Sequence, residues 1–442
     1  MKIITAVRGF KDILPGESEK WQYVEAKARE IFGAFGFREI VLPILEKTEL
    51  FKRSIGETTD IVEKEMYTFV DRGDESLTMR PEATASVMRA YLEHGLYASE
   101  SLVKLYTIGP MFRRERPQKG RFRQFNQLNA ELLGSKDPRV DAEVILMLVH
   151  FLRSVGVADA RLEVNSLGCP ACRPAFRDVI QSYLAERQEG LCEDCRRRLS
   201  TNPLRVFDCK VEGCKAVVAS APLLIEFLCA ECRGHFDEVQ ACLRRFETPF
   251  EVNARMVRGL DYYTKTAFEV TTGALGAQNA IAGGGRYDRL VEDLGGPESP
   301  GIGFAVGLER LVAVAPIPDE KVIAAPDLFI AALGKEAQDH AFVLCNRLRM
   351  KGVLVETDYG ARSLKSQMKR SDRLKCRYTL ILGERELQEK KALLRDMQDS
   401  TQRPVGLDVA EDELLSILSK ESYWTVRQRR DAERQQAEGK KV

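Results

Sequence analysis

The chain has 442 residues, of which 44% are hydrophobic and 30% charged, and its formal net charge at pH 7 is +1. This length allows two to four domains with cores of their own, and the composition is typical of a globular protein. The chain has 67 basic and 66 acidic side chains, so the protein as a whole has no strong electrostatic field. Any contact with nucleic acid must therefore come from local basic patches. No apolar run is long enough for a membrane span, and the sequence predicts a cytoplasmic protein without membrane contact.

The first hundred residues alternate between helical and strand-like patterns. Apolar side chains from Trp21 to Phe35 have the spacing of one helix face, and residues 40–43 predict a strand that a proline ends. Two short strands at 68–70 and 77–79 flank a polar turn, which predicts a hairpin. A proline then introduces a helix whose first turn contains Glu82 and Thr84, residue types that favour that position.

Residues 109–125 predict a strand, a basic loop that contains Arg113, and a return strand. Polar and apolar residues then alternate with the period of a strand. The polar set suits a pocket lined by the sheet, and it consists of Gln127, Asn129 and Glu131. The apolar set suits a core, and it consists of Leu128, Ala130 and Leu132.

A helical pattern at 140–152 and a strand at 161–164 precede a change in composition, because eight of the eleven cysteines occur in four close pairs. The pairs are Cys169 and Cys172, Cys192 and Cys195, Cys209 and Cys214, and Cys229 and Cys232. In a cytoplasmic protein of this size such pairs favour thiols or metal over disulfides. They predict two four-thiolate zinc sites, while the spacing leaves open which pairs combine and whether the thiols are simply reduced and without metal.

The stretch from Arg258 to Thr264 contains Tyr262 and Tyr263 and precedes an apolar strand at 267–270. Tyrosine and arginine combine a flat body with a polar tip, so together they suit a planar polar ligand and an anion. A strand, a glycine turn and a helix start follow at 279–288, and no Gly-Lys-Ser/Thr follows these glycines as a P-loop requires. Tyr287 lies in this segment.

Residues 301–311 predict a glycine-rich strand that runs into a helix, with Arg310 near the helix start. After a proline-containing linker at 316–326, strands and helices alternate, which predicts a small α/β domain with a largely parallel sheet. A basic cluster lies within it, comprising Lys365, Lys369, Arg370, Arg373, Lys375 and Arg377. The polar tail at 421–442 predicts frayed helix or disorder.

Taken together, these segments resemble the bacterial histidyl-tRNA synthetases, a class II aminoacyl-tRNA synthetase family. Residues 8–15 resemble the first family segment, 21–43 motif 1, 109–125 motif 2, 258–264 a signature of the histidyl group, and 301–311 motif 3. The resemblance implies an α/β protein, with an α+β catalytic domain whose sheet is mixed and mainly antiparallel, and a small α/β anticodon-binding domain. The implied boundaries are 1–166 and 248–318 for the catalytic domain, 167–247 for a cysteine-rich helical insertion, 325–420 for the anticodon-binding domain and 421–442 for the tail.

The resemblance also implies roles for individual residues. The family's acid and threonine that receive the α-ammonium group match Glu82 and Thr84, with Ala83 between them where glycine is usual. The positions that bind the adenylate's phosphate, the amino group and the amino acid are Arg113, Gln127 and Glu131. Arg258 corresponds to the arginine that replaces a metal ion at the α-phosphate. Arg310 points at the ATP phosphates, and Mg²⁺ binds the outer ones.

A pocket for histidine has to match a neutral imidazole, which offers one N–H donor and one acceptor on opposite edges. Glu131 suits the acceptor and Tyr263 the donor, with Tyr262 and Tyr287 as walls and supports. The predicted function is a homodimeric histidine–tRNA ligase, which uses L-histidine, ATP and tRNA(His). One alternative is a catalytically silent paralogue, the regulatory subunit of ATP phosphoribosyltransferase; it is disfavoured because all three arginines and the terminal domain are present. A zinc-ribbon nucleic-acid-binding protein would leave the catalytic segments unexplained.

Overall fold

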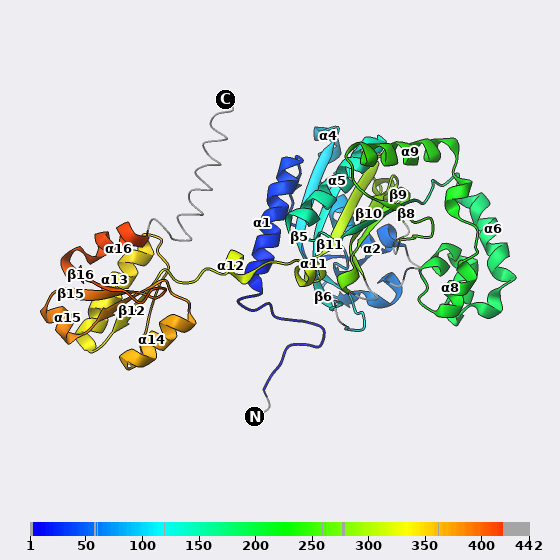
Figure 1. The fold of residues 1–442 in the computed structure, drawn as a ribbon. Helices are drawn as coiled ribbons and strands as arrows, with labels where there is room; N and C mark the ends of the chain where they lie inside the picture. Colours follow the sequence, from blue (N-terminus) through cyan, green and yellow to red (C-terminus); the bar gives the residue numbers. More distant parts are fainter. Residues whose placement is uncertain are drawn as a thin grey trace. The chain divides into compact units, whose positions relative to one another are not determined.

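The computed structural model describes residues 3–418, apart from 57, 58, 60, 119, 259, 261, 276–278 and 361, so the predicted tail at 421–442 lies outside the described residues. The chain divides into two compact units after Pro318 (Figure 1). The strands of the first unit are β1 (Arg38–Glu39), β2 (Leu45–Lys47), β3 (Tyr67–Val70), β4 (Ser76–Met79), β5 (Val103–Phe112), β6 (Gln124–Leu133), β7 (Arg161–Ser166), β8 (Glu251–Val252), β9 (Thr264–Thr271), β10 (Ala280–Arg286) and β11 (Gly301–Gly307). Its helices are α1 (Ser18–Ala34), α2 (Thr48–Ile55), α3 (Thr84–Glu93), α4 (Leu96–Ser99), α5 (Pro138–Ser154), α6 (Arg173–Ala185), α7 (Glu193–Thr201), α8 (Glu212–Val218), α9 (Ala230–Arg245), α10 (Leu290–Asp293) and α11 (Leu308–Val314).

The centre of the first unit is an eight-stranded sheet in the order β1-β5-β6-β11-β10-β9-β7-β8. Only the two edge pairs, β1 with β5 and β7 with β8, are parallel, which confirms the prediction of a mixed, mainly antiparallel sheet. The predicted alternation in β6 is also present, because the fully buried Leu128, Ala130 and Leu132 alternate with Gln127, Asn129 and Glu131, which line the cavity described below. The opposite face of β6 therefore remains available for polar side chains.

Helices cover one face of this sheet. Phe32 of α1 makes edge contacts with Phe151 of α5 and Phe304 of β11, at centroid distances of 5.6 and 5.8 Å. Such edge-to-face arrangements are favourable for aromatic rings in a core. α9 packs along α5 in turn (Figure 1). The helical layer thus leaves the other face of the central strands open.

A second, three-stranded sheet has the order β2-β4-β3 and includes the predicted hairpin. The strand predicted at 40–43 was wrong, since β1 ends at Glu39 and β2 begins at Leu45. A buried arginine accounts for the difference. The Arg80 guanidinium donates to the carbonyl oxygens of Leu42 and Pro43, at 3.1 and 3.4 Å, where a neighbouring strand would otherwise supply donors.

The segment between β7 and β8 is helical, as the family resemblance implied. It contains α6, α7, α8, α9 and the short turns η2 (Gln188–Gly190), η3 (Pro203–Asp208) and η4 (Leu224–Phe227). Phe176, Ile180 and Leu184 of α6 are buried and pack in one cluster with Cys195 and Cys214. Other short turns of the first unit are η1 (Ile61–Glu65) and η5 (Gly273–Leu275).

The second unit is a five-stranded sheet in the order β13-β12-β14-β15-β16. Only β13, β12 and β14 run parallel, so the prediction of a largely parallel sheet missed an antiparallel hairpin. The strands are β12 (Leu328–Ala332), β13 (Val355–Thr357), β14 (Tyr378–Leu382), β15 (Lys391–Asp396) and β16 (Gln402–Gly406). The helices and one short turn are α12 (Asp319–Val322), α13 (Lys335–Met350), α14 (Leu364–Arg373), α15 (Glu384–Gln388), η6 (Leu407–Val409) and α16 (Ala410–Leu418). None of the helices in the described part of the chain has both the length and the apolar character that crossing a membrane requires.

Candidate active site and cysteine clusters

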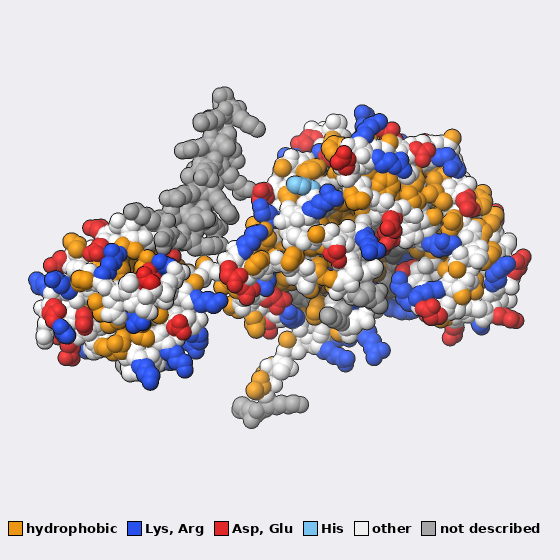
Figure 2. Space-filling model, in the orientation of Figure 1, with side chains coloured by type: hydrophobic (Ala, Val, Ile, Leu, Met, Phe, Trp, Pro, Cys, Tyr) orange, Lys and Arg blue, Asp and Glu red, His pale blue; other side chains and the backbone are white. Residues whose placement is uncertain are grey.

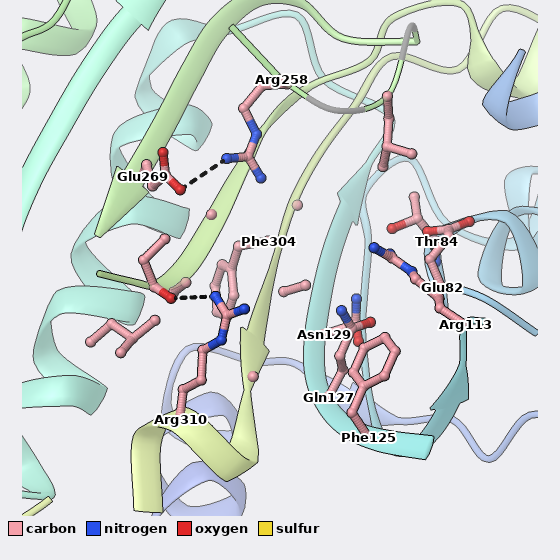
Figure 3. Close-up of a pocket in the computed structure, with 18 of the residues that line it drawn as sticks. Glu82, Thr84, Arg113, Phe125, Gln127, Asn129, Arg258, Glu269, Phe304 and Arg310 are labelled. Carbon is pink, nitrogen blue, oxygen red and sulfur yellow. Dashed lines mark hydrogen bonds and ion pairs between the residues drawn. The ribbon is translucent and has the colours of Figure 1, made fainter. Parts of the chain in front are cut away.

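A cavity of about 290 Å³ lies against the open face of the central strands (Figure 3). Its walls come from α3, β6, β10 and β11, from the loop between β5 and β6, and from the segment before β9. Every pocket residue predicted from the sequence lines this one cavity. These residues are Glu82, Thr84, Arg113, Gln127, Glu131, Arg258, Tyr262, Tyr263, Tyr287 and Arg310.

Glu82 lies at the start of α3, where backbone N–H groups have no partner within the helix. Its carboxylate accepts from the N–H groups of Thr84 and Ala85, at 2.8 and 2.7 Å. Burial raises the pKa of Glu82, while these two hydrogen bonds oppose that shift. The acid is therefore fixed in position at the cavity wall beside Thr84 (Figure 3).

Glu131 lies deeper in the cavity and is held from two sides. Its carboxylate accepts from the Thr84 hydroxyl at 2.7 Å and from the Tyr287 hydroxyl. Burial raises the pKa of Glu131 to about 8, although both hydrogen bonds act in the opposite direction. Gly303 is its partner on β11, and a Cβ there would overlap the carboxylate. Only glycine leaves room for the acid at this register position.

Three tyrosines surround the same end of the cavity. The rings of Tyr262 and Tyr263 are 4.6 Å apart between centroids, and Tyr287 meets Tyr262 edge-on at 5.7 Å. All three are buried. Flat apolar walls and hydroxyl groups together suit a small aromatic ligand with polar edges.

Arg258 lies on the opposite side of the cavity from Glu82 and points into it (Figure 3). Its Nη1 is 3.8 Å from a carboxylate oxygen of Glu269, and its Cζ is 5.6 Å from the centre of the Tyr263 ring. A Cβ at residue 283 would lie 2.6 Å from Nη1, so the guanidinium rests directly on the glycine backbone of β10. Its Nε is buried and has no hydrogen-bond partner among the described residues.

Two further arginines face the cavity. The Nε of Arg113 donates to the Pro81 carbonyl at 2.9 Å, and its Cζ is 5.4 Å from the centre of the Phe125 ring. Arg310 of α11 donates to the carbonyl oxygens of Gly120 and Ala280, at 3.0 and 2.9 Å. Arg113 also lies near Glu115, with 3.8 Å between Nη1 and the nearest carboxylate oxygen. A guanidinium stays charged in proteins, so both side chains present positive charge to the cavity.

Two buried amide oxygens indicate that the cavity is built for a polar ligand. The Oε1 of Gln127 and the Oδ1 of Asn129 are buried and lack hydrogen-bond partners in the part of the chain described. Leaving such a group unpaired costs about 1–3 kcal/mol. Both side chains lie on the cavity face of β6 (Figure 3). A bound molecule with hydrogen-bond donors would remove this cost.

Other lining residues were not predicted as site residues, and they include Glu115, Arg121, Phe125, Asn129, Glu269 and Glu309. The strand alternation pointed to Asn129, but the remainder depend on tertiary contacts. Glu115 pairs with Arg121 at 2.7 Å, and Glu309 accepts from the backbone N–H of Asn126 at 2.8 Å. Such contacts between a loop, a strand and a distant helix leave no periodic signal.

The eight paired cysteines assemble into two groups in the helical segment. The first cluster comprises Cys169, Cys172, Cys229 and Cys232, and the second cluster comprises Cys192, Cys195, Cys209 and Cys214. Within each cluster all four sulfur atoms lie within 4.8 Å of one another. The first pair of the sequence thus combines with the fourth, and the second with the third, which the spacing had left open.

The sulfur spacing matches tetrahedral zinc. Four sulfur atoms at about 2.3 Å from one ion lie about 3.8 Å from each other. Cys169 Sγ is 3.6 Å from Cys172 Sγ and 4.0 Å from Cys229 Sγ, and Cys192 Sγ is 3.8 Å from Cys209 Sγ. The N–H of Cys232 donates to the Cys229 sulfur and lowers its pKa to about 7. Both donor sets therefore fit a zinc ion.

Comparison with known proteins agrees with this geometry. The histidyl-tRNA synthetase family model matches residues 9–311, and an anticodon-binding domain model matches residues 327–421. A histidine–tRNA ligase of Geobacter sulfurreducens is 57% identical over 405 residues, covering 92% of this chain and 98% of that protein.

Solved structures give the same result. Apo histidyl-tRNA synthetase of S. aureus is similar at a TM-score of 0.78 and 36% identity, with 93% of this chain and 100% of that one covered. A Bacillus halodurans chain described as an ATP phosphoribosyltransferase regulatory subunit/histidyl-tRNA synthetase shares only the fold, at 17% identity and a TM-score of 0.61, over 86% of this chain and 98% of that one. The chain belongs to the histidyl-tRNA synthetase family.

Proposed function

We propose that the chain is a histidine–tRNA ligase, which joins L-histidine to ATP as histidyl-adenylate and transfers the histidyl group to the 3′ end of tRNA(His). One observation carries the proposal: acids, tyrosines and arginines from distant segments line one cavity, which also presents two unpaired amide oxygens. Activation joins two anionic reactants, so the catalyst has to align them and neutralise charge.

Histidine would occupy the end of the cavity near Glu131. The imidazole N–H would donate to a carboxyl oxygen of Glu131 and the other ring nitrogen would accept from the Tyr263 hydroxyl, with Tyr262 and Tyr287 beside the ring. The α-ammonium group would bind Glu82, Thr84 and Gln127. The unpaired Oε1 of Gln127 supports this assignment, because an ammonium group supplies the donor that it lacks.

ATP would bind toward the arginines. Arg113 and Arg258 would hold the α-phosphate and Arg310 the γ-phosphate, because a guanidinium remains charged and grips phosphate through two hydrogen bonds. Class II synthetases use ATP with Mg²⁺, which neutralises charge on the outer phosphates when bound. Glu115, Glu269 and Glu309 line the cavity and offer the oxygen ligands that this ion prefers.

The test is histidine-dependent exchange of labelled pyrophosphate into ATP, followed by charging of tRNA(His). A ligase performs both reactions, whereas a regulatory subunit of ATP phosphoribosyltransferase performs neither. That alternative is not favoured, because the curated relatives at 57% identity are histidine–tRNA ligases over nearly their whole length. A purified protein that binds histidine and ATP but exchanges no pyrophosphate would contradict the proposal.

We also propose that each cysteine cluster binds one structural Zn²⁺. Support comes from the sulfur distances and from the pairing of four thiols in each cluster. When bound, the ion supplies cross-links that a small helical segment otherwise lacks. Elemental analysis of purified protein should give about two zinc ions per chain. Absence of zinc, with thiols that titrate freely in the folded protein, would contradict this assignment.

A homodimer would form through the small β2-β4-β3 sheet and the segment before it. Large apolar side chains are exposed there, which is unusual unless another chain covers them. They are Val41, Ile44, Leu45, Phe69 and Val70. Sedimentation of the Val41→Glu variant should show a monomer, while Val409→Glu in the second unit, also at an exposed valine, should not. A dimeric Val41→Glu variant would place the interface elsewhere.

The second unit would bind the anticodon region of tRNA, and the domain boundaries given by the sequence would hold: 1–166 with 248–318, 167–247, and 325–420. Lys365, Lys369, Arg373 and Lys375 are exposed on or next to α14, which suits phosphate contacts (Figure 2). Arg370 and Arg377 instead pair with Asp358 and Asp396, at 3.4 and 2.9 Å. Because its substrate is tRNA and its thiols are reduced, the protein would act in the cytoplasm.

A further inference from the structure

The first cluster is joined through the backbone to the strand that follows Tyr263. The N–H of Lys265 donates to the Gly168 carbonyl at 2.8 Å, and the Lys265 carbonyl accepts from Leu167 at 2.7 Å. Gly168 directly precedes Cys169, and a Cβ at 168 would lie 2.8 Å from the Cβ of Cys172. No intervening layer therefore separates the thiols from this strand.

Two charged side chains add further links. Arg173, which follows Cys172, donates through Nη2 to the Tyr263 carbonyl and through Nε to the Leu167 carbonyl, the latter at 3.3 Å. Glu231, which precedes Cys232, accepts from the Lys265 ammonium at 2.9 Å. The links from Gly168, Arg173 and Glu231 thus each begin one residue from a cysteine of the first cluster, and they end between Tyr263 and Lys265.

The backbone at Lys265 shows that these links constrain the strand. Its φ is +45°, in the left-handed region that residues other than glycine rarely adopt. The side chain is only 7% exposed, and its ammonium lies between Glu231 and Asp288, the latter at 3.6 Å. A conformation of this kind persists where the surrounding structure fixes it, and here the links to the first cluster contribute together with the ion pair to Asp288.

We infer that a metal ion in the first cluster fixes the position of Tyr263 for histidine binding, with Arg173 and Glu231 as positioning residues. The inference rests on the proposed function, both for histidine and for zinc. The segment of the second cluster is hydrogen-bonded to a different point, since Arg255 donates to the Val218 carbonyl at 3.4 Å. Residues 202–205 of that segment line a cavity with Arg258 and Tyr263, so the second cluster adjoins Tyr263 through packing, whereas the first cluster is joined to the following strand by backbone hydrogen bonds. The two clusters should therefore differ in their effect on histidine.

The link is tested without disturbing the cysteines by comparing Glu231→Gln with Glu238→Gln on the same helix, α9. Glu231 is largely exposed, so its ion pair with Lys265 contributes modestly. Loss of this ion pair should raise the dissociation constant of histidine, measured by calorimetry, about fivefold. The KM for histidine should rise in parallel, while kcat, ATP affinity and zinc content stay within about twofold of the wild-type values. Glu238→Gln should match the wild type. Equal histidine affinities for the two variants would overturn the assignment of Glu231.

The metal is tested with Cys232→Ala and Cys195→Ala, one variant in each cluster. Both should lose about one zinc ion per chain, and only Cys232→Ala should weaken histidine binding, by about tenfold. Equal weakening in both would indicate general loss of insertion structure and would overturn the inference. Wild-type protein without zinc would instead refute the zinc proposal and with it the role of the ion, whereas the Glu231→Gln comparison still tests the positioning contact.

Discussion

The Thr84 hydroxyl donates to Glu131 at 2.7 Å and so joins the start of α3 to the centre of the sheet inside the cavity. The two residues are 47 positions apart in sequence. Glu82 instead accepts from two backbone N–H groups at the same helix start. The acids therefore have separate supports, and each can meet a different end of an amino acid.

The raised pKa of Glu131 predicts how stability depends on pH. The folded protein keeps this proton up to about pH 8, whereas an unfolded chain releases it near pH 4.5. The contribution of Glu131 to the unfolding free energy is therefore complete below pH 4.5 and is lost as pH rises through 8. Between these two values the unfolding free energy should fall by about 1.4 kcal/mol per pH unit, a few kcal/mol in all. Glu131→Gln has no such proton.

Urea unfolding of the ligand-free protein at pH 5, 6.5 and 8 measures this effect. The variant should have nearly wild-type stability at the lowest pH and a growing advantage as pH rises, because Glu131 ionises in the unfolded chain while the buried acid keeps its proton, whereas glutamine stays neutral in both states. Parallel curves for the two proteins would mean that Glu131 titrates normally.

The residues predicted for the pocket line one cavity, and each of them belongs to a short local pattern in the sequence. Strand alternation indicated the exposed face of β6, and the family segments supplied Arg113, Arg258 and Arg310. What the sequence did not predict depends on tertiary contacts. The strand expected at 40–43 was displaced by hydrogen bonds from Arg80, thirty-seven or more positions away.

The missed hairpin has a similar origin. β15 carries charged residues at both ends, and only Ala392 and Leu394 are buried within it, so its alternation is short. Likewise, the combination of cysteine pairs follows from the fold that brings Cys169 beside Cys229, 60 positions later. Spacing alone specifies neither.

Gly303→Ala should abolish histidine binding while the protein still folds. The added methyl group would overlap the Glu131 carboxylate and also lie 2.6 Å from the Ala130 carbonyl, so the acid has to move. We expect histidine affinity to fall by at least about a hundredfold, with a loss of stability of about 1–3 kcal/mol from overpacking. Gly33→Ala in α1 is the control, because a Cβ there meets nothing within 4 Å. Calorimetry with histidine distinguishes the two variants, and equal affinities would show that Glu131 relaxes freely.

Truncation after Pro318 should separate activation from transfer, because the chain divides at that residue and every predicted pocket residue precedes it. The truncated protein should keep part of its pyrophosphate exchange and lose most of its tRNA charging, since the exposed lysines near α14 are removed. Mutating Lys365 and Lys369 to Gln in the full chain should weaken tRNA binding without altering exchange. Parallel loss of both activities in a folded, dimeric truncation would contradict this division.

The last prediction separates the roles of Tyr263 and Arg258. The guanidinium carbon of Arg258 lies 5.6 Å from the centre of the Tyr263 ring. Tyr263→Phe keeps the ring and removes only the hydroxyl proposed to donate to the imidazole. Histidine use should weaken by about 1–3 kcal/mol, or roughly fivefold to 150-fold in kcat/KM, because the ring nitrogen is left without a donor. ATP affinity should be nearly unchanged. Tyr97→Phe, at a half-exposed ring, is the matched control.

Arg258→Ala should have the opposite signature, because its guanidinium is proposed to act on the α-phosphate and not on the imidazole. Histidine should still bind, while the exchange rate should fall by at least about a thousandfold, since charge that develops at the phosphate is no longer neutralised. The exposed Arg139→Ala variant controls for loss of charge. Steady-state exchange with histidine and ATP varied separately resolves the two effects. Near-normal exchange in Arg258→Ala, or unchanged histidine kinetics in Tyr263→Phe, would show that these roles are wrongly assigned.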